Sequence, residues 1–324
     1  MHSIEQYREA FISYMAAANI QKEPANLYEP ISYILNLGGK RMRPVLTLMA
    51  AEVFDVSYEK ALPAAMAVEV FHNFSLVHDD IMDDAPLRRG NETVHEKWDI
   101  NTGILSGDAM LILAYQYFEQ YEPTVFKQLA RLFSKTALEV CEGQQWDVDF
   151  ETRDDVTIGE YLKMIEYKTA VLVASAMKMG AIIAGTSDEN CAAIYDFGLN
   201  LGIAFQLQDD YLDAFGDPQT FGKRVGGDII ENKKTFLFLK AAEVAILENN
   251  SQLEHLYSIQ PTDSSDKIES IKEIFVSTGA ADATREAINQ YTLRAFEALE
   301  KMVLADDKKE VLQVFGQKLM QRKV

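Results

Sequence analysis

The segment NFSLVHDDIMDDAPLRRG, residues 73–90, carries four aspartates within six positions, directly after an apolar run with helical spacing. Two adjacent arginines follow after three further residues. Carboxylates this close repel one another and oppose ionisation, and a helix C-terminus already carries a partial negative charge. The segment therefore predicts a helix that ends at a site whose charge needs a cation.

A second segment, DDYLD at residues 209–213, repeats the D-D-x-x-D pattern of DDIMD at residues 79–83. In a helix this spacing puts the first and last aspartates on one face. Each copy follows a long apolar run and precedes a proline, Pro86 or Pro218. Carboxylate oxygens on one helix face suit Mg²⁺, which keeps water and substrate oxygens as its remaining ligands. The pair of motifs thus predicts a magnesium site.

Apolar residues recur at helical spacing along almost the whole chain of 324 residues, which has only 8 prolines and 17 glycines. This pattern predicts an all-α fold in a single domain, 1–324. A polar loop at 258–267 sets off a peripheral C-terminal helical part, 260–324. We expect helices over residues 3–19, 25–37, 44–55, 60–83, 101–120, 124–149, 158–185, 188–215, 232–248, 264–278, 280–303 and 306–321.

Charge and composition exclude several classes of protein. The net charge of −19 argues against a nucleic-acid partner, because no basic stripe offsets phosphate repulsion. No apolar run reaches the roughly 18–20 residues of a membrane span, and the amphipathic N-terminus is no secretion signal. The two cysteines, Cys141 and Cys191, are expected to be buried free thiols, which fits a cytoplasmic location.

Basic residues gather beside glycine turns or beside the acidic motifs. Arginine fits phosphate bidentately, and lysine serves as a point charge. One polyanion would be bridged to the aspartates through Mg²⁺ and another held directly, so two diphosphates are the expected ligands. The basic residues are Lys40, Arg41 and Arg43 in GGKRMRP, Arg88 and Arg89 in LRRG, and Lys223 in FGKRVGGD.

The five histidines offer no nucleophile-base arrangement. His72 lies seven residues before Asp79 on the same helix face, so we expect it to bind ligand. His78 is interpreted as structural, His95 has no evident catalytic partner, and His2 and His255 look peripheral. Chemistry without a protein nucleophile indicates ionisation of a substrate, with Mg²⁺ stabilising a diphosphate leaving group.

These motifs resemble those of the trans-isoprenyl diphosphate synthases, also called polyprenyl synthetases. The similarity runs in order along almost the whole chain, and the ordered set is far more specific than any one motif. The motifs are GGKRMRP, HNFSLVHDDIMDDAPLRRG, GDAML, GQQWD, YKTA, FQLQDDYLDAFGD and GKRVGGDIIENKKT.

The resemblance implies a homodimer of all-helical bundles, each with a deep central cleft. It implies three Mg²⁺ ions, with Mn²⁺ as a substitute, held by Asp79, Asp83 and Asp209 and supported by Asp80, Asp210 and Asp213. Contacts to the allylic diphosphate are implied for Arg88, Lys168, Lys223 and Lys233. Contacts to isopentenyl diphosphate are implied for Lys40, Arg43, His72 and Arg89. Thr169 and Gln206 would face the developing carbocation.

The implied reaction is head-to-tail prenyl transfer from dimethylallyl, geranyl or farnesyl diphosphate to isopentenyl diphosphate. The allylic C–O bond ionises, the isopentenyl double bond attacks C1, and a proton is lost to the departing diphosphate. The protein would supply positioning and electrostatics in a cleft that excludes water.

Product length depends on the helix before Asp79. Ser75 and Phe74 precede it by about 6 and 7.5 Å at 1.5 Å per residue. We expect Phe74 to form a floor with Phe71 behind it, although an ordinary core role for Phe74 is the alternative. A short product follows, with C20, geranylgeranyl diphosphate, favoured over C15, farnesyl diphosphate.

Three other functions fit part of the pattern. A class I terpene cyclase also ionises an allylic diphosphate, but it needs no second diphosphate site. A non-catalytic subunit of a heteromeric prenyl synthase would generally lose aspartates from one motif. An acidic helical scaffold that binds Ca²⁺ or a basic partner explains the aspartates but not the basic clusters.

Overall fold

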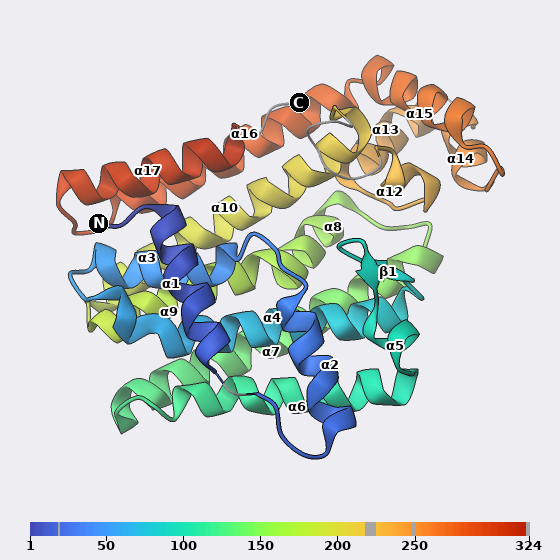
Figure 1. The fold of residues 1–324 in the computed structure, drawn as a ribbon. Coiled ribbons are helices and arrows are strands. Elements are labelled where there is room, and N and C mark those ends of the chain that lie inside the picture. Colours follow the sequence, from blue (N-terminus) through green and yellow to red (C-terminus); the bar gives the residue numbers. More distant parts are fainter. Residues whose placement is uncertain (19, 218–224, 248–250, 322–324) are drawn as a thin grey trace. The chain divides into compact units, whose positions relative to one another are not determined.

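The computed structural model describes residues 1–18, 20–217, 225–247 and 251–321, and almost all of its regular structure is helical (Figure 1). The predicted all-α class is therefore confirmed. In the described part of the chain the only sheet is an antiparallel hairpin of two-residue strands, β1 (Leu87–Arg88) and β2 (Asn91–Glu92).

The chain divides into two compact units, described separately below. Unit 1 comprises Met1–Ser134 and Ser175–Cys191, and unit 2 comprises Lys135–Ala174 and Ala192–Val324. Unit 1 begins with α1 (Ile4–Ala17), α2 (Ala25–Asn36), α3 (Met42–Val53), η1 (Tyr58–Ala61) and α4 (Leu62–Met82). After the hairpin come α5 (Val94–Lys97) and α6 (Ile100–Phe118).

Three helices carry the chain from one unit to the other: α7 (Pro123–Thr152), α9 (Val171–Ala184) and α10 (Asp188–Phe215). Within unit 2 lie α8 (Ile158–Ile165), a single π turn η2 (Glu166–Ala170), α12 (Gly227–Ile230) and α13 (Phe236–Leu247). They are followed by α14 (Gln252–Tyr257), α15 (Ser265–Ser277), α16 (Ala280–Glu300) and α17 (Asp306–Met320).

The long helices lie where the apolar periodicity predicts them, and α10 has the predicted bounds. The helix expected over 158–185 is interrupted by the π turn η2, which no periodicity signals. The hairpin and the short helices η1, α5, α12 and α14 were not predicted, because elements this short leave too few residues for a repeating pattern.

Unit 1 is built around α4, which packs along α6 and against α3. The consecutive residues 64–71 of α4 are all buried, so this helix is surrounded by protein rather than half exposed. Gly180 of α9 lies against the backbone of Thr47 and Ala51 in α3, where a Cβ atom would collide. Close helix packing therefore needs glycine at this position.

A buried ion pair fastens the start of α3 to α4. The Arg41 guanidinium donates to the Glu69 carboxylate and to the carbonyl oxygen of Leu35 at the end of α2. Asn73, one turn along α4, donates to the same carboxylate at 3.0 Å. Both charged side chains are at most 3% exposed. The segment GGKRMRP is thus held on the helix that carries the first aspartate motif.

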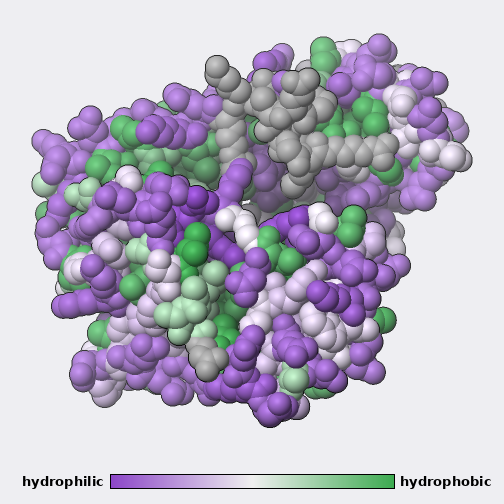
Figure 2. All heavy atoms as spheres, in the orientation of Figure 1, coloured by the Kyte–Doolittle hydropathy of each residue, from purple (hydrophilic) through white to green (hydrophobic). Residues whose placement is uncertain are grey.

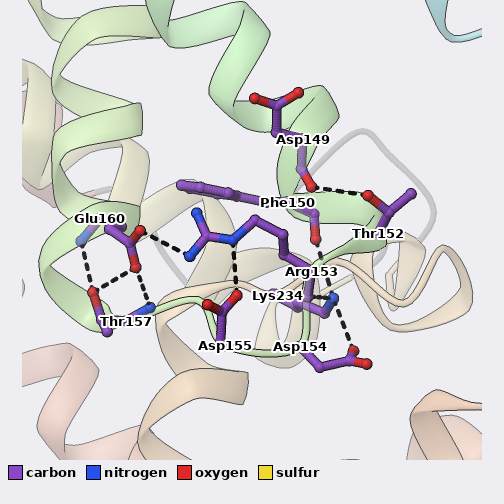
Figure 3. Close-up of polar contacts among 9 residues, drawn as sticks. All are labelled: Asp149, Phe150, Thr152, Arg153, Asp154, Asp155, Thr157, Glu160 and Lys234. Carbon is purple, nitrogen blue, oxygen red and sulfur yellow. Dashed lines mark hydrogen bonds and ion pairs between the residues drawn. The ribbon is translucent and has the colours of Figure 1, made fainter.

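In unit 2 the connection from α7 to α8 is held by polar contacts (Figure 3). The Lys234 ammonium donates to the carbonyl oxygens of Phe150, at 3.1 Å, and of Arg153, and pairs with Asp154. Thr157 caps α8 and exchanges hydrogen bonds with Glu160 in a capping box. These contacts hold the end of α7, where Phe150 also packs in the core of unit 2.

The face shown in Figure 2 is mostly hydrophilic, with small separate apolar areas, as the net charge of −19 leads one to expect. Both cysteines are free, as predicted. Cys191 is buried, whereas the predicted burial of Cys141 is wrong, because this residue is exposed on α7. One described helical stretch, Ile158–Ala184, is long and apolar enough to cross a membrane, and 56% of its most apolar window is buried inside the protein. The core helices of soluble proteins pass the same test.

Removing one partner of the Arg41–Glu69 pair should destabilise the protein strongly. Glu69→Gln leaves the Arg41 guanidinium buried without its counter-charge, which costs about 3–5 kcal/mol. We expect a large fall in the urea midpoint, followed by circular dichroism. Glu5→Gln removes a comparable carboxylate from the exposed Arg8–Glu5 pair and should leave the midpoint nearly unchanged. Equal midpoints for the two variants would contradict an anchoring role for the buried pair.

Candidate active site

The first aspartate motif lies at the end of α4 in unit 1. Asp79 is partly buried within the last turn, and exposed Asp83 is the C-cap residue. The Asp83 N–H donates to the Asp79 carbonyl oxygen at 2.8 Å, so helical geometry holds and both side chains share one face. Two carboxylates on one face at a helix C-terminus form an anionic site suited to a hard divalent cation.

Asp80 serves a different purpose from its neighbours. Its carboxylate is 1% exposed and accepts hydrogen bonds from the Arg88 guanidinium, with Nε at 2.9 Å from Oδ1. Arg88 lies on β1, so this pair ties the hairpin to α4. The contact positions Arg88, and a metal-supporting role for Asp80 stays a prediction.

Several cationic side chains converge in unit 1, and the described carboxylates beside them, Glu69 and Asp80, are already paired with Arg41 and Arg88. Arg43 lies 3.1 Å from the His72 ring nitrogen Nε2, and its own buried Nε has no hydrogen-bond partner among the described residues. Burial, followed by the neighbouring guanidinium groups of Arg43, Arg89 and Arg88, holds the pKa of His72 well below its usual range. His72 is therefore neutral at pH 7, and the cluster keeps an excess of guanidinium charge suited to an anion.

Backbone strain gathers in the same segments. Among the residues that the structure describes, five that are not glycine have positive φ, and four of these lie within the motifs quoted above: Arg41, Asp84, Arg89 and Asn232. Such conformations are uncommon for residues with a Cβ atom and persist only where the surroundings enforce them. Arg89, in the hairpin turn, is held by donating to the Gly38 carbonyl oxygen.

The second motif lies in the last turns of α10 in unit 2. Asp210 is buried and accepts hydrogen bonds from Tyr161 and from Gln206, the latter at 2.9 Å. Asp213 accepts from the backbone N–H of Asp228 at 2.9 Å, which brings a further carboxyl group to the motif. Burial and the charges of Asp210 and Asp213 raise the pKa of Asp228 to about 8. Crowding of this degree calls for a cation.

The π turn η2 presents the YKTA residues beside α7. Gly143 of GQQWD lies against the backbone of Tyr167 and Lys168, where a Cβ atom would collide. This approach lets the Lys168 ammonium reach the Asp147 carboxylate at 2.5 Å. Thr169 donates to the Gln206 side-chain oxygen at 3.3 Å, so these two predicted carbocation-facing groups are in contact.

The remaining predicted basic residues differ in their surroundings. Lys40 is exposed. Lys233 pairs with Glu231 at 2.9 Å, and this pairing outweighs its burial, so the pKa of Lys233 is raised. Lys223 and Pro218 lie outside the described residues. Roles for Lys40, Lys233 and Lys223 stay predictions.

Four residues that the sequence did not single out shape the site. The positions of Glu69, Asp147 and Tyr161 each depend on a contact distant in sequence, so only a structure reveals them. Asp228 had a signal that was overlooked: a carboxylate directly after two glycines, in the segment that holds Lys223.

The residues predicted to limit chain length form part of an aromatic cluster in unit 1. Phe74 is 8% exposed and its ring lies 5.4 Å from Phe71 and 4.8 Å from His78, between centroids. Phe71 in turn meets Phe133 at 5.0 Å. Ser75 is partly buried and donates to the His72 carbonyl oxygen at 2.9 Å.

Comparisons with known proteins agree on one family. The family model described as polyprenyl synthetase matches residues 24–275. A crystal structure of a geranylgeranyl pyrophosphate synthase is 54% identical, with a TM-score of 0.96 and full coverage of both chains. The geranylfarnesyl diphosphate synthase of Natronomonas pharaonis is 40% identical over 283 residues, which cover 82% of this chain and 81% of the relative.

A further solved structure carries ligands. It is the polyprenyl synthase from Caulobacter crescentus complexed with calcium and isoprenyl diphosphate, 28% identical with a TM-score of 0.84, covering 99% of this chain and 98% of that one.

The raised pKa of Asp228 should make the metal-free protein less stable as pH rises. Folded Asp228 keeps its proton up to about pH 8, whereas the ordinary pKa of an aspartate side chain is 3.8. The native state therefore binds more protons than the unfolded state between these values. The stabilisation is fully present at low pH and is lost as pH rises through about 8.

With a chelator present, Asp228→Asn should lose less thermal stability than wild type when the pH is raised from 6 to 9. Asp196→Asn, on the exposed side of α10, should behave as wild type. The measurement is the thermal midpoint across the pH series. An identical pH dependence for Asp228→Asn and wild type would show that the proton does not reside on Asp228.

Proposed function

Because the chain belongs to the polyprenyl synthetase family, we propose that it condenses isopentenyl diphosphate head-to-tail with allylic diphosphates to give a short all-trans product. It is an enzyme of the prenyl diphosphate synthase family. The observation that carries the fuller proposal is a pair of complementary charge imbalances among the residues that the structure describes. Guanidinium groups gather around His72 in unit 1, and carboxylates gather around Asp228 in unit 2.

The metal of this reaction would be Mg²⁺, bound through Asp79, Asp83 and Asp209 as three ions, with Mn²⁺ as a substitute. The donor set fits, because every proposed ligand atom is a carboxylate oxygen and the crowding of Asp210, Asp213 and Asp228 disfavours the metal-free state. Mg²⁺ would supply charge stabilisation to the departing diphosphate. The relative that holds calcium and isoprenyl diphosphate supports this proposal.

Isopentenyl diphosphate would be bound directly by Arg43, Arg89, His72 and Lys40. Neutral His72 can donate one ring N–H, while Arg43 supplies the charge that this imidazole lacks. The allylic diphosphate would contact Arg88, Lys168, Lys233 and Lys223. Lys168 would reach it by exchanging or sharing its Asp147 partner.

The hydrocarbon part of the reaction needs groups that favour a carbocation without attacking it. The Thr169 hydroxyl already donates to Gln206, so its lone pairs and the Gln206 amide dipole are oriented by the protein. Preorganised dipoles stabilise developing charge without reorganisation. Neither group is a strong nucleophile, which suits a step in which the isopentenyl double bond must attack first.

We further propose a C20 product over C15, with Phe74 as the floor and Phe71 behind it. The buried Phe74 ring, supported by Phe71 and His78, is a rigid barrier of the required kind. The 54% identity to a geranylgeranyl pyrophosphate synthase supports C20, while the geranylfarnesyl relative shows that a longer product occurs among similar proteins. A homodimer and a cytoplasmic location stay predictions.

One assay tests the function. Purified protein is incubated with isopentenyl diphosphate, Mg²⁺ and each allylic primer, and the products are identified by mass. Elongated linear diphosphates are expected. Cyclic hydrocarbons would indicate a terpene cyclase instead, and no turnover with any primer would indicate a non-catalytic subunit or an acidic scaffold.

Loss of a metal-binding carboxylate should abolish most of this activity. Asp79→Asn and Asp209→Asn should each lower kcat by about a hundredfold or more, because the leaving group loses charge stabilisation. Asp196→Asn is the matched control and should retain full turnover. Wild-type rates in both motif variants would remove the aspartates from the mechanism.

Truncation of the floor should lengthen the product. Phe74→Ala removes the ring and should shift the products beyond those of wild type, whereas Phe74→Leu should shift them less. The measurement is chromatography of the dephosphorylated products. Phe275→Ala makes a comparable cavity in the core of unit 2 and should leave product length unchanged. An unaltered product from Phe74→Ala would assign this residue to the ordinary core.

A further inference from the structure

His95 is a buried histidine whose ring nitrogens are both without a hydrogen-bond partner among the residues that the structure describes. The residue is 8% exposed and lies in the short helix α5, directly after the hairpin. It packs beside α4 and α6, since Gly103 of α6 leaves space that is shared by Ile81 and the His95 Cβ atom. Buried polar atoms are almost always satisfied, so this ring indicates a missing partner.

Two carboxylates stand beside this imidazole. Asp84 follows the end of α4, and Glu96 is the next residue after His95. One ligand atom from each of Asp84, His95 and Glu96 lies within 4.8 Å of the other two. The His95 Nε2 atom lies 3.8 Å from the Glu96 carboxylate, too far for a hydrogen bond but close enough for both to bind one ion.

The geometry is close to that of a bound divalent ion. Zn–N and Zn–O bonds of about 2.0–2.2 Å in a tetrahedral site place ligand atoms roughly 3.4 Å apart. The ligand atoms of the three residues lie up to 4.8 Å apart, so they must approach one another to bind an ion. The exposed side chains of Asp84 and Glu96 can do so by rotating, whereas His95 is held by its packing.

The backbone prepares the site before any ion binds. The Thr93 hydroxyl donates to the Ala85 carbonyl oxygen at 2.8 Å, and the Thr93 N–H donates to the Pro86 carbonyl oxygen. These bonds bring the start of α5 back to the end of α4. Asp84 lies there with a φ of 48°, in the left-handed region that aspartate adopts more readily than most residues with a Cβ atom.

Nearby cations have other contacts. Lys97 lies over the Tyr33 ring, 3.9 Å from its centroid, Arg88 is bound to Asp80, and Arg89 to the Gly38 carbonyl oxygen. The carboxylates of Asp84 and Glu96 thus keep their charge available for an ion.

We propose that Asp84, His95 and Glu96 bind a Zn²⁺ ion, at a site outside the residues proposed for prenyl transfer. An imidazole nitrogen favours Zn²⁺ over Mg²⁺, which prefers oxygen ligands alone. Three protein ligands leave further coordination positions to water. The ion would cross-link the end of α4 to α5. It would thereby join the two ends of the hairpin segment that carries Arg88 and Arg89.

The test is calorimetric titration of chelator-treated full-length protein with Zn²⁺, in millimolar Mg²⁺ to occupy oxygen-only sites. Wild type should bind one more Zn²⁺ per chain than His95→Gln or Glu96→Gln. Because Glu96 is exposed, the Glu96→Gln variant should fold normally. Loss of Zn²⁺ binding in this variant therefore reports on the ligand and not on misfolding. His255→Gln replaces an exposed histidine that also neighbours a glutamate and should bind as wild type.

Co²⁺ absorption gives a second readout that is independent of prenyl transfer. Wild type and His255→Gln should show a visible band that both site variants lack. Equal Zn²⁺ stoichiometry in wild type and His95→Gln would overturn the proposal, and so would loss of the ion in His95→Gln but not in Glu96→Gln.

Discussion

The buried pair of Arg41 and Glu69 is the constraint on which the binding side of unit 1 depends. It fixes the start of α3 against α4, and so sets Arg43 beside His72, one turn along from Glu69. Buried ion pairs contribute little net stability, because desolvation offsets attraction. This pair instead fixes the position of α3 along α4. Because α4 carries Glu69, His72 and Asp79, the pair places the cationic cluster and the first aspartate motif in a fixed arrangement.

The two units have local charge imbalances of opposite sign. In unit 1, His72 and Arg43 meet other positive groups, and their pKa values fall with burial. In unit 2, Asp210 and Asp228 are buried beside other negative groups, and both burial and this repulsion raise their pKa values. Each imbalance lowers the free energy of unfolding of the ligand-free chain. A ligand of opposite charge offsets it and stabilises the folded state by mass action.

The helices and the two aspartate motifs could be predicted from the sequence, because periodicity and i, i+4 spacing are local properties. Contacts that cross the chain could not. Arg41 and Arg43 are two residues apart, yet one forms a buried pair and the other lies at the ligand cluster. Lys233 and Lys234 are adjacent but also have different contacts. Lys233 pairs with Glu231, whereas Lys234 donates to a carbonyl oxygen at the end of α7. The π turn packs against Gly143, which belongs to another helix.

The Asp80–Arg88 contact has a consequence for binding rates and affinities. A free arginine side chain loses up to about 2 kcal/mol of conformational entropy when it is immobilised. Arg88 is already held through Nε and one terminal nitrogen by a carboxylate that is itself buried. The entropy of the Arg88 side chain is therefore lost when the protein folds, not when an anion binds. An anion that binds this guanidinium contacts a side chain already held in one rotamer, so the free energy of binding is reduced less by ordering.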